Sequence, residues 1–538
     1  MKLRFRGVSL FVLALTLPTL VHAQDTAGDP AAVTGEAIDT PVDDAPQAEA
    51  APAPTGDPVL DRLNALEARV KSLETENSSL KAAAAETQTR VEKVEVRAAK
   101  GLATNGIVPT FSDVNGTTTF KIRGVVDADY VGFNERKGGY DYNNGTGFRR
   151  ARIGVEGTAF KNFNWRLEAD FAGNTVALQD AYVQYVGIKP LQITLGQHKA
   201  PFGLESNNSD NYNTFLERGM FNVLAANIVA ERRIGLSVGY IKPNFTLTAG
   251  IFGENESIGR AANNASASSS CAKSVPPNNT PLPSLCDTPD EGWGGSVRAT
   301  WEPILEDRKI LHVGAAAAYR TNLRSATAVG VQATERPSIR VDNGNIIDSG
   351  VIPDAKSAFY WGLEATGIYG PFSLTGEYGQ LKIDRKNFSA LPTATQALLV
   401  PGAGDPTFSG WYVYGSWFLT GESRPIKNGN FDRIKPFSNF DGHGGWGAVE
   451  LALRYDSADV SDTPVIARRI KETLPDKSVV YHKATKAHAL TAAVNWYWNP
   501  FIKLQLNYIR FAGMHTPLDP IGNKTAGDAF AARLHFDW

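Results

Sequence analysis

The sequence has little of what marks a helical membrane protein or a recognisable enzyme. Only one apolar run stands out, at residues 8–17, so a bundle of membrane helices is excluded. The 54 basic and 56 acidic residues nearly balance, which gives no overall attraction for nucleic acid. No nucleophile–base–acid arrangement, zinc-ligand spacing or phosphate-binding glycine loop is apparent, and we expect no catalytic residue, metal or cofactor. A hydrolase remains an alternative, because the residues of a catalytic triad come together in the fold and need not be close in the sequence.

The single apolar run has the organisation of a secretory signal. Three basic residues precede it, and the small-x-small sequence Val21-His22-Ala23 follows it. The pattern predicts a signal peptide over residues 1–23, cleaved before Gln24. An uncleaved membrane anchor is the alternative, although the run is short for one.

Cysteine is also scarce. The two cysteines, Cys271 and Cys286, lie in one polar segment rich in Asn, Ser and Pro. In the oxidising compartment that a secretory signal implies, we expect them to form a disulfide within this loop. Two unpaired thiols are the alternative, and the spacing of a zinc or redox site is absent.

The first part of the mature chain changes from irregular to helical periodicity. Residues 24–56 are rich in Ala, Pro, Asp and Thr and are predicted to form a disordered linker. Residues 57–100 carry apolar side chains in alternating steps of four and three, which predicts a coiled coil and an oligomer. Asn77 falls at a core position, where a polar residue fixes register. A single solvated helix is the alternative.

From about Thr118 the period becomes two, the spacing of strands. Transmembrane strands of about 9–11 residues alternate lipid-facing and lumen-facing side chains in this way. We expect sixteen such strands, at 118–131, 146–160, 162–173, 176–188, 190–198, 232–242, 244–253, 292–302, 309–321, 357–369, 371–384, 408–420, 445–457, 485–498, 500–511 and 526–538.

The connections between these strands also indicate a membrane barrel. Tight breaks such as Gly370-Pro371 and Asn499-Pro500 alternate with long polar loops, the pattern of outer-membrane proteins. The last strand is amphipathic and ends in Trp538, which resembles the assembly signal of such barrels. Residues 101–538 are therefore predicted to form an all-β, sixteen-stranded antiparallel transmembrane β-barrel in outer-membrane lipid, with the N-terminal coiled coil in the periplasm. A soluble β-sandwich is the alternative.

One connection is unusually long for a strand-to-strand link. Residues 196–233 are polar and irregular in the middle, and long connections of this kind are usually functional. We expect this segment to fold into the barrel lumen and limit its bore.

Basic residues gather near this connection. Arg150 and Arg152 share a lumen-facing parity, whereas Arg149 points elsewhere unless the strand end bends. Lys199 and Arg218 belong to the long connection or its hinges. Guanidinium groups suit planar oxyanions, and rings of Arg or Lys favour anions in pores. Acidic residues share the same strand faces, so an unselective lumen is the alternative.

From about Phe120 to Trp538 the chain resembles the phosphate-selective porin O and P family. The resemblance rests on the order and spacing of several segments: Phe148-Arg149-Arg150-Ala151-Arg152-Ile153, Asn164-Trp165, Gly196 with Phe202-Gly203-Leu204-Glu205, Leu216-Glu217-Arg218, Ala318-Tyr319-Arg320, Leu419-Thr420-Gly421-Glu422, Gly447-Ala448-Val449-Glu450-Leu451, Arg454-Tyr455-Asp456 and Val494-Asn495-Trp496-Tyr497.

The resemblance implies a homotrimer of barrels whose third external loop folds inward. It implies an anion constriction that includes Arg149, Arg150 and Arg218, with Arg298 and Arg320 as members of an anion-guiding ladder. Selective members carry lysines just after the Gly-Leu-Glu step, but here Ser206 to Asn211 contain none, and the nearest lysine is Lys199 upstream.

The sequence thus predicts a passive outer-membrane channel for small anions, phosphate or polyphosphate among them. A general or organic-solute porin of low selectivity is one alternative. A barrel-anchored envelope tether is another, because the heptads at residues 59–94, at about 1.5 Å per residue, span roughly 50 Å and could reach the cell wall.

Overall fold

The structure is a computed structural model. It describes the following residues: 56–103, 107–113, 115–137, 142–221, 228–229, 231–254, 292–323, 331–352, 355–386, 403–465, 472–473, 479–480, 485–514 and 524–538. The predicted signal peptide, nearly all of the predicted linker and both cysteines lie outside these residues. The chain divides into two compact units after Gln88, the first with most of a long helix and the second with a large sheet.

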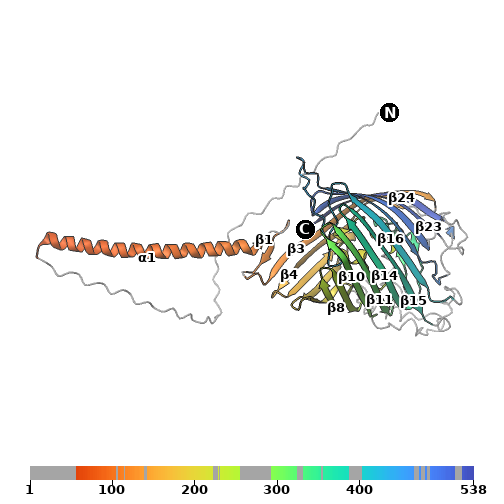
Figure 1. The fold of residues 1–538 in the computed structure, drawn as a ribbon, viewed down its shortest axis with the longest axis horizontal. Coiled ribbons are helices and arrows are strands. Elements are labelled where there is room, and N and C mark those ends of the chain that lie inside the picture. Colours follow the sequence, from red (N-terminus) through yellow and green to blue (C-terminus); the bar gives the residue numbers. More distant parts are fainter. Residues whose placement is uncertain are drawn as a thin grey trace, which may run out of the picture. The chain divides into compact units, whose positions relative to one another are not determined.

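The long helix α1 runs from Pro58 to Gly101 (Figure 1). Its start follows from local chemistry, because the Asp57 side chain accepts a hydrogen bond from the Val59 N–H at 2.9 Å and Pro58 needs no amide partner. Among the residues described, no helix combines the length and apolarity needed to cross a membrane. The helical segment predicted at 57–100 is confirmed, and its pairing with other helices stays a prediction.

The second unit is a closed barrel of sixteen long antiparallel strands. Each strand pairs with its neighbours in chain order, and the last pairs with the first. All sixteen predicted strands are confirmed. They are β3 (Thr119–Lys137), β4 (Gly145–Ala159), β5 (Phe163–Asp170), β6 (Ala177–Tyr185), β7 (Leu191–Lys199), β8 (Arg232–Lys242), β9 (Phe245–Phe252), β10 (Gly294–Glu306), β11 (Lys309–Thr321), β14 (Ala355–Tyr369), β15 (Phe372–Arg385), β16 (Thr407–Phe418), β19 (Ala448–Asp459), β22 (Lys486–Tyr497), β23 (Ile502–Met514) and β24 (Lys524–Asp537).

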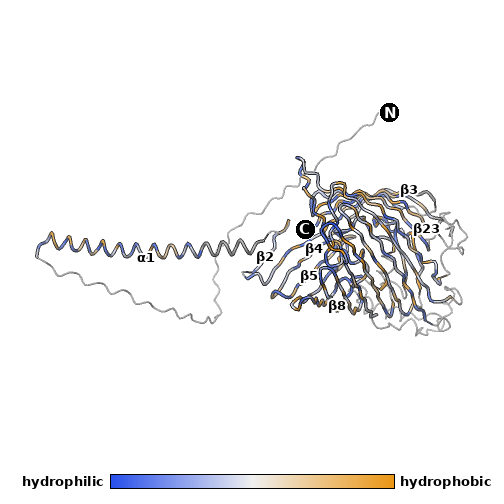
Figure 2. Tube along the Cα trace, in the orientation of Figure 1, coloured by the Kyte–Doolittle hydropathy of each residue, from blue (hydrophilic) through white to orange (hydrophobic). Residues whose placement is uncertain are grey.

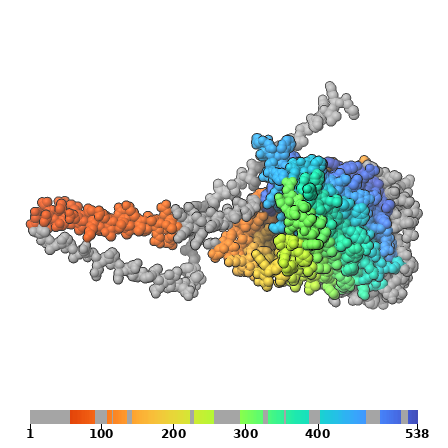
Figure 3. All heavy atoms as spheres, viewed as in Figure 1, coloured from red at the N-terminus to blue at the C-terminus, as the bar shows by residue number. Residues whose placement is uncertain are grey.

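The barrel unit also contains shorter elements besides the sixteen long strands. They are β1 (Leu102–Ala103), β2 (Thr110–Ser112), β12 (Thr334–Glu335), β13 (Ile347–Asp348), β17 (Ile426–Lys427), β18 (Asn430–Phe431), β20 (Glu472–Thr473), β21 (Val479–Val480), the helical turn α2 (Leu204–Asn207) and the 3-10 turns η1 (Ala172–Asn174) and η2 (Asp210–Tyr212). Strands β1 and β2 extend the sheet beside β3. Figure 3 shows the barrel strands following one another in chain order across the visible face.

The alternation in the sequence becomes two faces of the barrel wall. In β14, for example, Trp361 and Leu363 are exposed on the outside, whereas Glu364 and Thr366 are buried inside. Figure 2 shows the corresponding alternation of apolar and polar residues along the strands. An apolar exterior and a polar interior are the arrangement that a lipid-embedded barrel requires.

The barrel closes through its C-terminal residue. Trp538 and Gly124 of β3 exchange two backbone hydrogen bonds, of 3.1 and 3.2 Å. The indole lies over the Gly124 Cα, so that a Cβ at residue 124 would approach ring atom Cζ2 to 2.0 Å. Glycine is required here because the terminal ring occupies the space of a side chain.

We therefore expect Gly124→Val to destabilise the folded barrel by about 1–3 kcal/mol, the usual effect of overpacking. The destabilisation is measured as a lower urea concentration at the midpoint of unfolding of the heat-modifiable folded form. Gly367→Val in β14 is the matched control, because no atom lies within 4 Å of a Cβ at that position. Equal midpoints for both variants would contradict this role of the terminal tryptophan.

Candidate functional site

The described part of the segment after β7, residues 200–221, 228–229 and 231, enters the barrel lumen as predicted; we call it the inner loop. Its described residues include α2 and η2. The Phe202 ring lies 4.4 Å from the ring of Tyr360 in β14, and the Phe215 ring lies 5.3 Å from that of Tyr414 in β16. All four rings are buried in one apolar cluster. The apolar side of the inner loop thus packs against the barrel wall at β14–β16.

Buried polar contacts fix the inner loop to the same wall. Glu377 of β15 accepts hydrogen bonds from the backbone N–H groups of Leu204 (2.6 Å) and Glu205 (3.0 Å). Arg454 of β19 donates to the Glu205 carboxylate at 3.3 Å and to the Glu217 carbonyl at 2.9 Å. Because these groups are out of water, breaking any one of them leaves an unpaired polar group and costs roughly 1–3 kcal/mol.

Strands β22–β24 complete this attachment. Asn495, Lys503 and Arg533 each donate to a main-chain carbonyl of the inner loop, at 2.8, 3.1 and 2.5 Å. The inner loop is therefore attached to the wall from β14 to β24. Two polar cavities lie beside β3–β10.

Asp210 of the inner loop gathers three of the predicted constriction arginines. Its carboxylate lies 2.6 Å from Arg218, 3.0 Å from Arg152 and 3.2 Å from Arg150. Burial raises the pKa of Asp210, but Arg150 and Arg218 outweigh it and hold this pKa well below its ordinary value. Asp210 is thus ionised, and it neutralises part of the cluster.

Two of these arginines have a second acidic partner on the barrel wall. Arg150 lies 2.7 Å from Asp127, and Arg152 lies 2.8 Å from Asp170. Their guanidinium groups are therefore bonded on both sides and are nearly inaccessible. An oxyanion must compete with these carboxylates for the same N–H groups.

Arg149 also faces the lumen, through a β-bulge. Asp127 pairs with Arg150 and Ala128 with Phe148, which leaves Arg149 as the extra residue of β4. The strand bends here. Strand parity predicts that Arg149 faces the lumen only if the end of this strand bends. Its guanidinium lies 2.7 Å from Glu217 of the inner loop.

Lys199 is the predicted site residue with a different environment. Its Nζ donates to the carbonyls of Ser206 (3.0 Å) and Asn208 (2.6 Å). Among the residues described, no carboxylate oxygen lies within 4.0 Å of this Nζ. An ammonium group has three N–H donors, so one remains for a solute. Lys199 thus makes no ion pair of its own within the described residues, although Asp180 and Asp210 line the same cavity.

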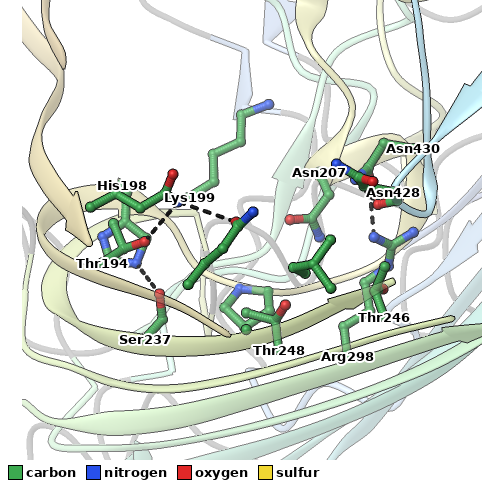
Figure 4. Close-up of a pocket in the computed structure, with 15 residues that line it drawn as sticks. Thr194, His198, Lys199, Asn207, Ser237, Thr246, Thr248, Arg298, Asn428 and Asn430 are labelled. Atoms are coloured by element: carbon green, nitrogen blue, oxygen red, sulfur yellow. Dashed lines mark hydrogen bonds between the residues drawn. The ribbon is translucent and has the colours of Figure 1, made fainter. Parts of the chain in front are cut away.

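Two cavities meet at Lys199. The first, of about 300 Å³, is lined by polar side chains of β7–β10 and by Asn428 and Asn430 from a later segment (Figure 4). The second, of about 250 Å³, is lined by five basic side chains, Arg123, Arg152, Arg166, Lys199 and Arg232, and by three acidic ones, Glu168, Asp180 and Asp210. The lining of the second cavity therefore has a positive excess.

Arg166 and Arg232 contribute to this excess, although neither was among the predicted site residues. Both contact Asp180, at 3.5 and 2.7 Å, and Arg166 also contacts Glu156 at 2.8 Å. The Arg166 side chain keeps 30% of its surface exposed, against 3% for Arg150. Alternation along a strand shows which side chains face the lumen, but it does not show how open each position is.

The two predicted ladder arginines lie apart from the Asp210 cluster. Arg298 contacts Glu364 at 2.5 Å and donates to the Gly429 carbonyl at 2.7 Å. Arg320 contacts Glu254 at 2.6 Å. Both are buried and paired, and their guidance of anions stays a prediction.

The first part of the segment between β16 and β19, residues 424–434, also enters the lumen, whereas residues 437–444 are exposed. Its hairpin β17–β18 turns at Asn428 and Gly429, both at positive φ, and Asn-Gly is the sequence signal for such a turn. The N–H of Phe431 donates to the Asn208 side chain of the inner loop at 2.9 Å. This second segment therefore contacts the inner loop inside the lumen.

A third segment, residues 331–352 with β12 and β13, reaches the cluster through Arg340. This guanidinium lies 3.3 Å from Glu217 and 3.5 Å from Glu335. Burial raises the pKa of Glu335 from 4.5 to about 7, although Arg340 opposes the shift. Glu335 therefore titrates near neutral pH.

Because this raised pKa favours the protonated form in the folded state, folding of this segment loses stability as pH rises from about 4.5 through about 7. Between pH 6 and pH 8 we expect the loss to be about 1 kcal/mol. Hydrogen exchange of residues 331–352, corrected for intrinsic rates, should be faster at pH 8. Glu335→Gln should abolish the difference, and a difference that persists in this variant would exclude Glu335 as its source.

Within the described residues, no three or more His, Cys, Asp or Glu side chains group as metal ligands. The structure brings Arg150, Arg152 and Arg218 together around Asp210 and places Arg149 beside Glu217, and Lys199 lines the same cavity as Arg152 and Asp210; their role as an anion constriction stays a prediction. It adds the carboxylates Asp210 and Glu217, which sequence reasoning passed over because their loop has no periodicity. In the polar cavities of the site most fixed charges are paired, and a few basic side chains such as Arg166 keep exposed surface.

The family model for phosphate-selective porin O and P matches residues 120–538. Porin O of Pseudomonas aeruginosa is 28% identical over 452 residues, covering 78% of this chain and 88% of that protein. An uncharacterized protein of Caulobacter vibrioides is 30% identical over 396 residues, covering 73% of this chain and 69% of that protein. Among solved structures, an anion-selective porin from Comamonas acidovorans matches with a TM-score of 0.44 and 14% identity, over 78% of this chain and all of that chain.

Proposed function

Because this chain belongs to the phosphate-selective porin O and P family, which makes it an outer-membrane porin channel, we propose that it admits small anions by passive diffusion with modest selectivity. The family is one of channels rather than enzymes. Phosphate is one of the anions that such a channel would pass.

The observation that carries the proposal is the environment of Lys199. Four of the five predicted constriction cations are bonded to Asp210 or Glu217, whereas Lys199 bonds only to carbonyl oxygens and lines both cavities. The basic side chains that outnumber the acidic ones in the lining of the second cavity lower the electrostatic cost of anion entry and raise that of cation entry.

The same pairing argues for weak rather than strong phosphate binding. Arg149, Arg150 and Arg218 would present phosphate with paired N–H donors if they were free. Here they are engaged by carboxylates, and the loop lysines of selective members are missing. A general porin of low selectivity is the second candidate, favoured by this charge balance.

The domain assignments and the assembly belong to the same proposal. Residues 1–23 are the signal peptide, 24–56 the linker, 57–100 a periplasmic coiled coil and 101–538 the channel, which assembles as a trimer. The cell-wall tether remains compatible with the channel, since it would use only the N-terminal helix.

Swelling of liposomes that contain the purified protein tests passive anion diffusion. Potassium salts of chloride and phosphate, with valinomycin to carry the cation, should give faster swelling than neutral sugars of equal size. Equal rates would favour the general porin, and no swelling from folded protein would reject the channel proposal.

A further inference from the structure

Helix α1 leaves a continuous apolar stripe exposed along the described chain. Val59, Leu66, Leu73 and Leu80 are exposed by 74, 58, 53 and 63%, and Leu63 and Val70 by 53 and 52%. Large apolar side chains that remain exposed on one helix face mark an interaction surface. Figure 2 shows apolar and polar residues alternating along α1.

The spacing assigns each residue a heptad position. Leu63, Val70 and Asn77 are at a, and Leu66, Leu73 and Leu80 are at d. The flanking g positions hold Arg62, Arg69 and Glu76, and the flanking e positions hold Glu67, Glu74 and Lys81. These six charged side chains are all exposed in the single chain.

The e and g charges identify the partner. In a parallel coiled coil, a g residue lies beside the e residue of the next heptad on the neighbouring helix. With two copies of α1 in register, these neighbours are Arg62 with Glu67, Arg69 with Glu74 and Glu76 with Lys81. Every pair has opposite charges, so one copy of this helix complements another.

Other alignments place like charges together. A slip by one heptad sets Arg69 against Lys81 in one direction and Glu76 against Glu74 in the other. An antiparallel pair sets e positions against e positions, which brings Glu67 and Glu74 against each other or against themselves. Asn77 adds to this selection, because a slip buries it against an apolar side chain.

We propose that α1 forms a parallel, in-register coiled coil with copies of itself. The inference does not depend on the solute of the channel. Because α1 ends at Gly101 and β2 begins at Thr110 of the same chain, the coil joins the barrels of neighbouring copies. It thereby gives the assembly an anchor independent of contacts between barrel walls.

Disulfide trapping in the full-length protein tests the alignment. In a chain with Cys271→Ser and Cys286→Ser, single cysteines are placed at the d positions with Leu66→Cys, Leu73→Cys or Leu80→Cys. Parallel in-register helices bring each of these residues beside its own copy, so all three variants should cross-link efficiently on oxidation. Ala68→Cys and Thr75→Cys, at the outward f positions, are matched controls and should link poorly.

An antiparallel pair can bring at most one of the three d residues beside its own copy. Cross-linking of only one d variant, or of none, would therefore overturn the proposal. A second test keeps the native cysteines: Arg69→Glu should lower the melting temperature of the helical circular-dichroism signal, and adding Glu74→Arg should restore it. Failure of the second change to restore the melting temperature would reject the charge pairing.

Discussion

Replacing Lys199 by glutamate is expected to remove the anion preference of the channel or reverse it. Two unit charges about 4 Å apart interact by roughly 1 kcal/mol in water and roughly 4 kcal/mol at an effective dielectric constant near 20. A partly desolvated pore lies between these limits. Loss of about 1–2 kcal/mol for anions corresponds to roughly a 5- to 30-fold fall in their relative permeability.

The measurement is the reversal potential across a planar bilayer that separates two concentrations of potassium chloride. Lys309→Glu is the matched control, because Lys309 is the first residue of β11, with 49% of its side chain exposed, and lies outside the cavity linings given above. Lys309→Glu should keep the wild-type potential. If Lys199→Glu kept it as well, another group would have to carry the selectivity.

Asp210→Asn is expected to convert the paired arginines into a stronger oxyanion site. The substitution removes the one carboxylate that Arg150, Arg152 and Arg218 share. A charge-assisted hydrogen bond contributes about 1.5–3 kcal/mol. If phosphate gains one such bond, its half-blocking concentration for chloride current should fall about tenfold or more.

This variant also tests whether the fold tolerates the change. Removing one partner of a buried ion pair commonly costs about 3–5 kcal/mol, although Asp127 and Asp170 still hold two of the arginines. Heat modifiability of the purified protein reports folding. Asp307→Asn, in an exposed turn, is the matched control and should leave phosphate block unchanged. Unaltered block in folded Asp210→Asn would show that the arginines do not reach the solute.

The strands could be predicted from the sequence because their pattern is local. Alternation of side chains between lipid and lumen is imposed on every strand, so a stretch such as 357–369 carries its own evidence. Its structural counterpart, β14, spans Ala355–Tyr369. The inner loop was predicted by contrast, since a long aperiodic segment interrupts this pattern.

The charge balance of the site could not be predicted in the same way. Asp210 meets Arg150 across 60 positions of sequence, and Glu217 meets Arg533 across 316. Such contacts depend on the path of the inner loop across the lumen, and the periodicity of the sequence does not predict this path. The inward turn of Arg149 depends on a one-residue bulge, which strand parity reads as the opposite face.

The most direct test of the central claim is the reversal potential of the wild-type protein in a potassium chloride gradient, followed by titration with phosphate. The account predicts a reversal potential shifted toward the chloride equilibrium value, with chloride current blocked only at high phosphate concentration. A potential at zero or toward potassium would contradict an anion-preferring lumen. Block at low phosphate concentration would contradict the neutralisation of the constriction arginines by Asp210 and Glu217.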